Sequence, residues 1–410
     1  MAGAADRYVS DVEIRKLELT DYPAAYALST EAFGPPPPGT PTPAPPTEPP
    51  PGRHTLCAFD GDRLVAKAVA LELASWLGGA EIPTCGIAGV AVAAEHRGSG
   101  LLGDVLAPLL AESVARGEVV STLYPTATGI YRSFGYELVT SYDCVEIPTA
   151  DLARVRAAGA TTTRRATPDD VPAMQAVYAT WAAAQNGPLT RTGLRFTQSP
   201  EELLAEHTGV TLAVDPDDRV VGWAGWERSG GYGPHGVLEI WDLYGLTADA
   251  YRALWTVAAS FTSVTGTVRL RTSGADPARL VLPTSAWASV ARHQHPYMLR
   301  VSDVAGALGA LAPRVPGLVA VVDVAVLGDR FGVTDGAYRL LLDDGPGRCE
   351  SIAATPGLPT YSPQGLALAV NGAQSCANLR LLGHLTGPDD HDAVLDAALA
   401  GRPLHVRDYF

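Results

Sequence analysis

The stretch AEHRGSGLLGDVL, from Ala94 to Leu106, places three glycines directly before a run with helical apolar spacing. Within it, GSGLLG (Gly98–Gly103) fits the pattern G-x-G-x-x-G of dinucleotide-binding folds. The overlapping RGSG (Arg97–Gly100) fits R-x-x-G, which is typical of coenzyme A sites. Both patterns describe a turn whose backbone N–H groups surround a pyrophosphate at a helix N-terminus. The flanking residues have to decide between the two ligands.

The surroundings of the turn argue against a Rossmann unit. In such a unit the first glycine directly follows a strand near the start of the domain, and an acidic residue ends the next strand about 20 residues later. Here Ala94–Arg97 separate the preceding strand from Gly98, and the next strand, Val119–Tyr124, ends in Tyr-Pro. A helix, a proline-rich loop and a hairpin precede the turn instead of βαβ units. Coenzyme A is therefore the ligand we expect.

The residues after the turn support this expectation. Leu102, Val105, Leu106 and Leu109 form an apolar helical stripe. After the next strand, TATGIYRSFGYELV (Thr126–Val139) predicts a short helix that breaks at a glycine into a further strand. This order of elements and motifs resembles the GNAT family of acyl-CoA N-acyltransferases. The resemblance implies that the strand Val90–Val92 pairs its backbone with the pantetheine amides, while the turn holds the pyrophosphate.

Composition restricts the class of protein. The chain has 410 residues, which favours two or three domains, and a net charge of −14, which argues against nucleic acid as a partner. An acidic surface favours cationic ligands, or serves solubility alone. The five cysteines form no C-x-x-C pair, so we expect free thiols in a cytoplasmic protein and no metal site. We find no secretory signal and no membrane span.

An internal repeat organises the first 300 residues. Arg15–Pro23 resembles Arg164–Pro172, and Thr55–Glu72 resembles Thr211–Glu227, in the same order and at similar offsets. The second copy has no glycine-rich turn, so we expect a degenerate domain without a cofactor site. The proline-rich segment 34–52 is expected to be an exposed loop.

The pattern of the sequence changes from about residue 300. Val319–Arg330 and Gly336–Asp344 predict neighbouring antiparallel strands, and Asp389–Gly401 predicts a helix closed by glycine. The predicted fold is α/β (α+β), with three domains: a catalytic GNAT domain at 1–150, a degenerate GNAT-like domain at 151–299, and a C-terminal domain at 300–410.

The whole layout resembles the enhanced intracellular survival (Eis) family of bacterial GNAT acetyltransferases. That resemblance implies a sterol-carrier-like third domain, acetyl-CoA as co-substrate and a hexameric homo-oligomer. It also implies that the acceptor is a cationic amine such as an aminoglycoside, and hence a role in antibiotic resistance. Transfer to a protein lysine or a polyamine by the same machinery is an alternative. A lipid-binding or scaffold protein with an inert GNAT domain is a rival of another class.

The resemblance also assigns roles to individual residues. Tyr131 would protonate the departing thiolate, as a tyrosine with an ordinary pKa near 10 is able to do. The α-carboxylate of Phe410 would act as the general base, with Asp408 adding negative potential for a cationic substrate. The expected cofactor-binding residues are Val90, Ala91, Val92, Arg97, Gly98, Ser99, Gly100, Leu101, Leu102, Gly103, Thr126 and Ala127.

Overall fold

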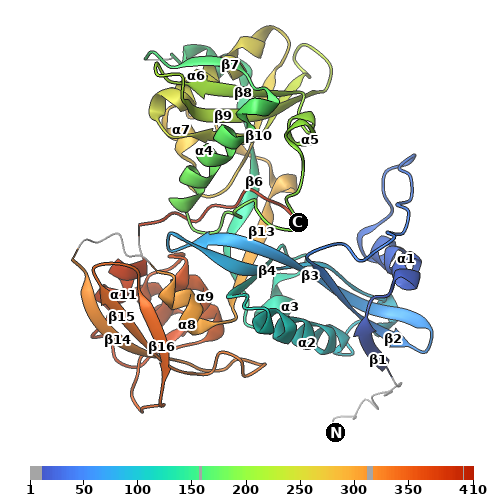
Figure 1. The fold of residues 1–410 in the computed structure, drawn as a ribbon, viewed down its shortest axis with the longest axis vertical. Helices are drawn as coiled ribbons and strands as arrows, with labels where there is room; N and C mark the ends of the chain where they lie inside the picture. Colours follow the sequence, from blue (N-terminus) through green and yellow to red (C-terminus); the bar gives the residue numbers. More distant parts are fainter. Residues whose placement is uncertain (1–11, 157–158, 312–316, 400) are drawn as a thin grey trace.

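A computed structural model describes residues 12–156, 159–311, 317–399 and 401–410. The chain forms three lobes, and the C-terminus lies where the first two meet (Figure 1). One sheet of 13 strands runs through the first and second lobes, and a sheet of five strands forms the third. The strand β6 (Glu137–Pro148) connects the first two lobes, because it pairs with strands of both.

The first lobe contains the glycine turn and the sheet edge beside it. The helix α2 packs against β2, β3 and β4, and its buried leucines belong to one core with α1. Its elements are β1 (Val12–Lys16), α1 (Tyr22–Phe33), β2 (Arg53–Asp60), β3 (Arg63–Leu77), β4 (Ala80–Val92), α2 (Leu101–Ala115), β5 (Val120–Leu123) and α3 (Thr128–Arg132). The segment 34–52 contains no helix or strand and is mostly exposed, as its prolines predict.

The second lobe repeats this arrangement. Its elements are β7 (Thr162–Arg165), α4 (Val171–Ala183), α5 (Pro200–Ala205), β8 (Gly209–Val214), β9 (Val220–Ser229), β10 (Val237–Gly245), α6 (Ala248–Ala259), β11 (Thr267–Thr272), α7 (Pro277–Leu280), β12 (Ala288–Ser289) and β13 (His295–Val301). The last strand, β13, returns to the first lobe and lies between β5 and β6. The predicted boundary after residue 299 therefore falls inside a strand of the shared sheet.

The two copies share a detailed hydrogen-bond pattern where each begins. Arg15 makes two bonds to the Asp21 carboxylate, at 2.6 and 3.0 Å, and Arg164 makes two to Asp170, at 2.7 and 2.6 Å. In each copy the aspartate also accepts the backbone N–H of the residue three positions earlier, and a proline is the second residue of the following helix. The same device at both positions agrees with duplication of an ancestral unit.

The third lobe is an α+β unit. Its elements are α8 (Val304–Gly309), β14 (Val319–Val326), β15 (Gly336–Asp343), β16 (Arg348–Ile352), β17 (Thr360–Tyr361), α9 (Pro363–Val370), α10 (Cys376–Leu381), β18 (Leu385–Thr386) and α11 (Asp392–Leu399). The strands β14 and β15 pair in antiparallel fashion, as predicted.

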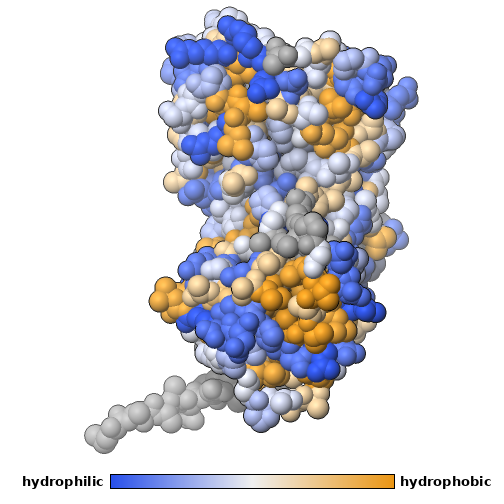
Figure 2. Space-filling view, turned by 90° about the vertical axis from the view of Figure 1, so that its left-hand side faces the viewer, coloured by the Kyte–Doolittle hydropathy of each residue, from blue (hydrophilic) through white to orange (hydrophobic). Residues whose placement is uncertain are grey.

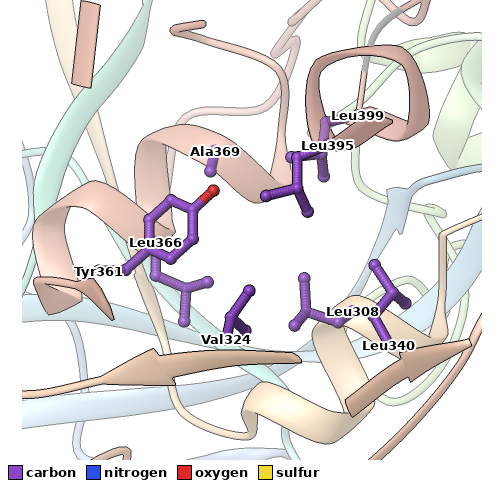
Figure 3. Close-up of a pocket in the computed structure, with 8 residues that line it drawn as sticks. All are labelled: Leu308, Val324, Leu340, Tyr361, Leu366, Ala369, Leu395 and Leu399. Atoms are coloured by element: carbon purple, nitrogen blue, oxygen red, sulfur yellow. The ribbon is translucent and has the colours of Figure 1, made fainter. Parts of the chain in front are cut away.

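The interior of the third lobe is apolar and nearly filled. Leu308, Val324, Leu340, Tyr361 and four residues of α9 and α11 face one another around a cavity of about 10 Å³ (Figure 3). Such a volume has room for about one water molecule. A sterol-carrier-like role for this domain stays a prediction.

The outer face of the third lobe exposes apolar side chains. Val319 and Val321 of β14 are 67% and 56% exposed, and Figure 2 shows a broad apolar patch in the lower half of this face. In the part of the chain that the structure describes, no helix is long and apolar enough to cross a membrane.

Candidate active site

A fork between β4 and β5 forms the centre of the first lobe. The two strands pair in parallel from Thr84 opposite Val120 to Ile87 opposite Leu123. Beyond this point β5 ends while β4 continues to Val92, through a bulge at Gly89, whose φ is +55°. The backbone of Val90, Ala91 and Val92 consequently has a strand neighbour on the β3 side alone. An extended ligand has room to pair with its free side.

The glycine turn lies at the carboxyl end of this strand. Gly98 and Gly100 have φ values of +79° and +99°, which other residues rarely adopt. A Cβ atom on either would meet no atom within 4 Å, so the outer side of the turn is open. Among the described residues, no hydrogen bond takes the backbone N–H groups of Gly98, Gly100, Leu101 or Leu102. Free donors at the N-terminus of a 15-residue helix suit a pyrophosphate.

The other predicted cofactor residues surround the turn and the fork. Arg97 is exposed and donates from Nε to the Val92 carbonyl at 3.3 Å, so its side chain spans from the turn to the fork. The Ser99 hydroxyl donates to the His96 carbonyl, while Gly103 is buried in the first turn of α2. Thr126 and Ala127 are exposed and follow β5 at the same edge of the sheet.

Tyr131 lies on the short helix α3 and is 7% exposed. Burial raises the pKa of its hydroxyl to about 12. Its ring meets Tyr136 edge-on at 6.1 Å, and among the described residues no hydrogen bond engages the hydroxyl. Tyr131 therefore keeps its proton at neutral pH and has it free to donate.

The C-terminal residues bring Phe410 to the base of the fork. A Cβ on Gly86 would come within 2.9 Å of Cε2 of Phe410, so glycine is needed for the ring to approach β4. The ring also meets Tyr124, the residue after β5, edge-on at 5.4 Å. Tyr124 in turn donates its hydroxyl to the Asp408 carbonyl at 2.6 Å.

Two arginines fix this tail to the second lobe. Arg191 donates from Nε to the Asp408 carboxylate at 2.9 Å, and both its terminal nitrogens bond to Asp242. Asp408 was expected to add negative potential; its carboxylate shares Arg191 with Asp242, and burial raises its pKa. Arg407, which is 3% exposed, donates to Asp276 at 2.9 Å and to the main-chain carbonyls of Leu243 and Arg271.

A cleft of about 950 Å³ opens between the first two lobes beside Phe410. Most of its wall is apolar or aromatic, with Arg191, Arg195 and several carboxylates among the polar groups. The apolar wall includes Leu71, Leu73, Tyr142, Leu189, Phe196, Trp223, Trp241 and Phe410. A small molecule with an apolar body fits such a lining.

Known proteins share this architecture. Residues 13–139 and 187–301 each match an acetyltransferase (GNAT) domain. An uncharacterized N-acetyltransferase of Streptomyces avermitilis is 30% identical over 381 residues, which span 85% of this chain and 87% of the relative. N-acetyltransferase Eis of Mycobacterium tuberculosis is 27% identical over 306 residues, 70% of this chain and 71% of that protein. The chain belongs to the Eis-like GNAT family.

As an Eis-like GNAT protein, the chain is an acetyl-CoA-dependent N-acetyltransferase, and the rival of an inert scaffold loses its basis. A solved GCN5-related N-acetyltransferase from Kribbella flavida has the same fold, with a TM-score of 0.82 and 26% identity over 99% of this chain and 100% of that one. The likeness therefore extends over all three lobes.

The site of this Eis-like protein contains residues that the sequence did not single out. Tyr124, Arg191 and Arg407 hold the tail in place, yet each acts on partners more than 50 positions away in the chain. No local pattern marks such residues. The glycine turn, by contrast, is contiguous in sequence.

Proposed function

We propose that the chain transfers the acetyl group of acetyl-CoA directly to a primary amine bound in the cleft beside Phe410. The main support for this proposal is that two features meet at the fork between β4 and β5. The open backbone of β4 and the free N–H groups of the turn suit the cofactor, and the cleft reaches the same fork from the other side through Phe410. Acetyl-CoA supplies an activated thioester.

Each group at the fork has a separate role in the reaction. Backbone N–H groups near Val90 would polarise the thioester carbonyl, as in an oxyanion hole. Tyr131 would donate a hydrogen bond to the sulfur as negative charge develops there. Complete transfer from a group with a pKa of about 12 to an ordinary thiolate near 8.5 is uphill by about 5 kcal/mol, so the proton moves as the bond breaks, not before.

The ammonium group of the acceptor has to lose a proton before it attacks. We assign this step to the α-carboxylate of Phe410, because the Phe410 ring lies on Gly86 at the fork, where β4 and β5 part. Extending the chain by a few residues after Phe410 should abolish turnover while coenzyme A still binds. Turnover at the native rate in the extended protein would refute this assignment.

The class of the acceptor is predicted from the family resemblance. A polycationic acceptor such as an aminoglycoside, a polyamine or a protein lysine each stays a prediction from the family resemblance, as does a hexameric assembly. Mass spectrometry after incubation with acetyl-CoA and each class of amine would count the acetyl groups added.

Substitution of Tyr131 tests the chemistry itself. Tyr131→Phe keeps the ring and removes the proton donor, so we expect kcat to fall by about 100-fold or more, with the KM of acetyl-CoA little changed. Tyr136→Phe is a matched control, because its hydroxyl bonds to Ser121 inside the core at 2.6 Å. A Tyr131→Phe enzyme with near-native kcat would rule out the assigned role.

A further inference from the structure

Three cations beside the acceptor cleft have no acidic partner. Among the residues that the structure describes, Arg53, Lys67 and Arg195 take part in no ion pair and no hydrogen bond. This is unusual in a chain whose net charge is −14, in which most arginines near the cleft are paired. Their surroundings therefore have to explain why they remain unpaired.

The strand register places two of these cations on the cleft side of the sheet. Arg53 of β2 lies opposite Leu71 of β3, and Leu71 lines the cleft. Lys67 is four residues before Leu71 on the same strand, and side chains at even spacing share a face. Arg53 and Lys67 thus point to the side from which Phe410 approaches β4.

The third cation reaches the same place from the second lobe. A Cβ on Gly52 would lie 3.2 Å from Cβ of Leu194, and Phe196 packs in one cluster with Leu71. Arg195 is held between these two contacts, and it lines the cleft. Arg53 and Arg195 are both exposed residues, and partial burial of the Arg53 guanidinium lowers its pKa.

Lys67 is the innermost of the three. It is 6% exposed, and its Nζ lies 3.9 Å from the position of a Cβ on Gly89, at the bulge of β4 next to Val90. Burial lowers the pKa of Lys67, and the charge of Arg53 lowers it further. A buried ammonium group without a partner is costly, and a bound anion would relieve that cost.

The carboxylates of the cleft lie on the side of the second lobe. Asp242 and Asp408 share Arg191, Glu206 accepts a hydrogen bond from Gln198 at 2.8 Å, and Glu227 also lines the wall. None of them forms an ion pair with Arg53, Lys67 or Arg195 among the described residues. At the end of the cleft near these three cations, the charges therefore favour a ligand with an acidic group near its amine.

We propose that Arg53, Lys67 and Arg195 form a site for the carboxylate of the acceptor, and that the acceptor is an amino acid with a large apolar side chain. This inference rests on the proposed acetyl transfer and names its substrate class. The carboxylate would lie against the three cations, the amine would face Phe410 and the fork, and the side chain would occupy the apolar part of the cleft. The product is an N-acetyl amino acid.

The test compares α-amino acids with their decarboxylated amines. The full-length protein is given acetyl-CoA and, in turn, L-phenylalanine, L-tyrosine, L-leucine or L-methionine, the four matching amines, or the aminoglycoside kanamycin. We expect kcat/KM for at least one amino acid to exceed that of its amine by 10-fold or more. Lys67→Met and Arg195→Gln should each raise the KM of the amino acid more than that of the amine, so that the ratio of the two kcat/KM values falls towards 1.

A control variant and a second readout separate this inference from its alternatives. Arg63→Gln removes an exposed cation that pairs with Glu95, far from the cleft wall, and should leave the preference intact. The anion could also be a phosphate of coenzyme A, in which case Lys67→Met and Arg195→Gln would raise the KM of acetyl-CoA instead. That result, or a preference for the amines or kanamycin, would overturn the inference and leave acetyl transfer standing. Coenzyme A binding without acetylation of any amine would overturn both.

Discussion

The two GNAT units of this chain build the same fork and fill it differently. In the first, β4 and β5 part after Ile87 and Leu123. In the second, β10 and β11 pair in parallel from Val237 opposite Thr267 to Ile240 opposite Leu270, and then part in the same way. A duplicated backbone therefore provides two equivalent openings, and side chains decide what each opening holds.

The helix that follows each fork shows the difference most clearly. In the first unit, α2 begins after Gly100, whose left-handed backbone leaves N–H groups without partners among the described residues. In the second, α6 begins after Thr247, whose hydroxyl oxygen accepts the N–H of Ala250 at 3.1 Å. A helix that caps itself has fewer donors to offer a phosphate.

The second fork is also occupied by the chain itself. Arg407 donates to the carbonyl of Leu243 on β10 and to that of Arg271 on β11, so its guanidinium bridges the two parted strands. Three residues later, Phe410 lies on Gly86 at the first fork. The degenerate unit thus binds Arg407 at its own fork, and this site, the tail socket, holds the C-terminal residues so that Phe410 reaches the intact unit.

Removing the Arg407 side chain from the tail socket should have the largest effect on turnover. Arg407→Met leaves Asp276 buried without its cation, at a cost of about 3–5 kcal/mol in stability, and frees the tail. We expect kcat to fall at least 100-fold while coenzyme A affinity, measured by calorimetry on folded protein, is retained. Arg407→Met combined with Asp276→Asn removes both charges and should recover much of the stability but not the activity. Full activity in either variant would show that the socket does not position the tail.

A change of pH should weaken the same attachment by a smaller amount. His405 is fully buried, neither ring nitrogen has a partner among the described residues, and burial lowers its pKa to about 3. Folding favours the neutral ring, so its stabilising contribution is complete above the ordinary pKa of about 6.5 and is lost as the pH falls from there towards 3. We expect a loss of about 2 kcal/mol in the free energy of unfolding between pH 7.5 and 5.

His405→Leu is the control for this pH effect. The variant has no group to protonate at this position, so chemical denaturation should show a shallower dependence of stability on pH over the same range. An unchanged dependence would mean that His405 does not carry the effect.

The smallest effect is expected at the cap of the second unit. Thr247→Ala removes the hydroxyl that accepts the Ala250 N–H, which should cost about 1 kcal/mol of stability. Coenzyme A affinity should not change, because α6 takes no part in cofactor binding. A loss of affinity in thermally intact protein would place cofactor at the second fork after all.

Whether the sequence predicts a structural feature depends on how far apart in the chain its contacting residues lie. The turn at Arg97–Gly103, the helix after it and the short helix with Tyr131 are contiguous, so their patterns predicted them. The repeat could be recognised because Arg15 and Arg164 lie in similar short segments of sequence. Fold class and family followed from these segments.

What the sequence did not predict involves distant pairs. Arg407 meets residues near 243, 271 and 276, and the return of β13 to the first lobe depends on strand pairing across more than 150 positions. In the sequence, Lys67 is a polar residue within a largely apolar strand. Its position next to Gly89 is known only from the fold. Periodicity and motif spacing contain no information about such contacts.

One fork binds the cofactor and the other holds the tail, so the full-length protein should have a single cofactor site, which calorimetric titration with coenzyme A measures. We expect one coenzyme A bound per chain. We also expect Gly100→Val, which places a β-branched side chain at a φ of +99° on the open face of the turn, to weaken binding by about 100-fold or more. Two molecules bound per chain, or native affinity in Gly100→Val, would contradict this assignment of the two forks.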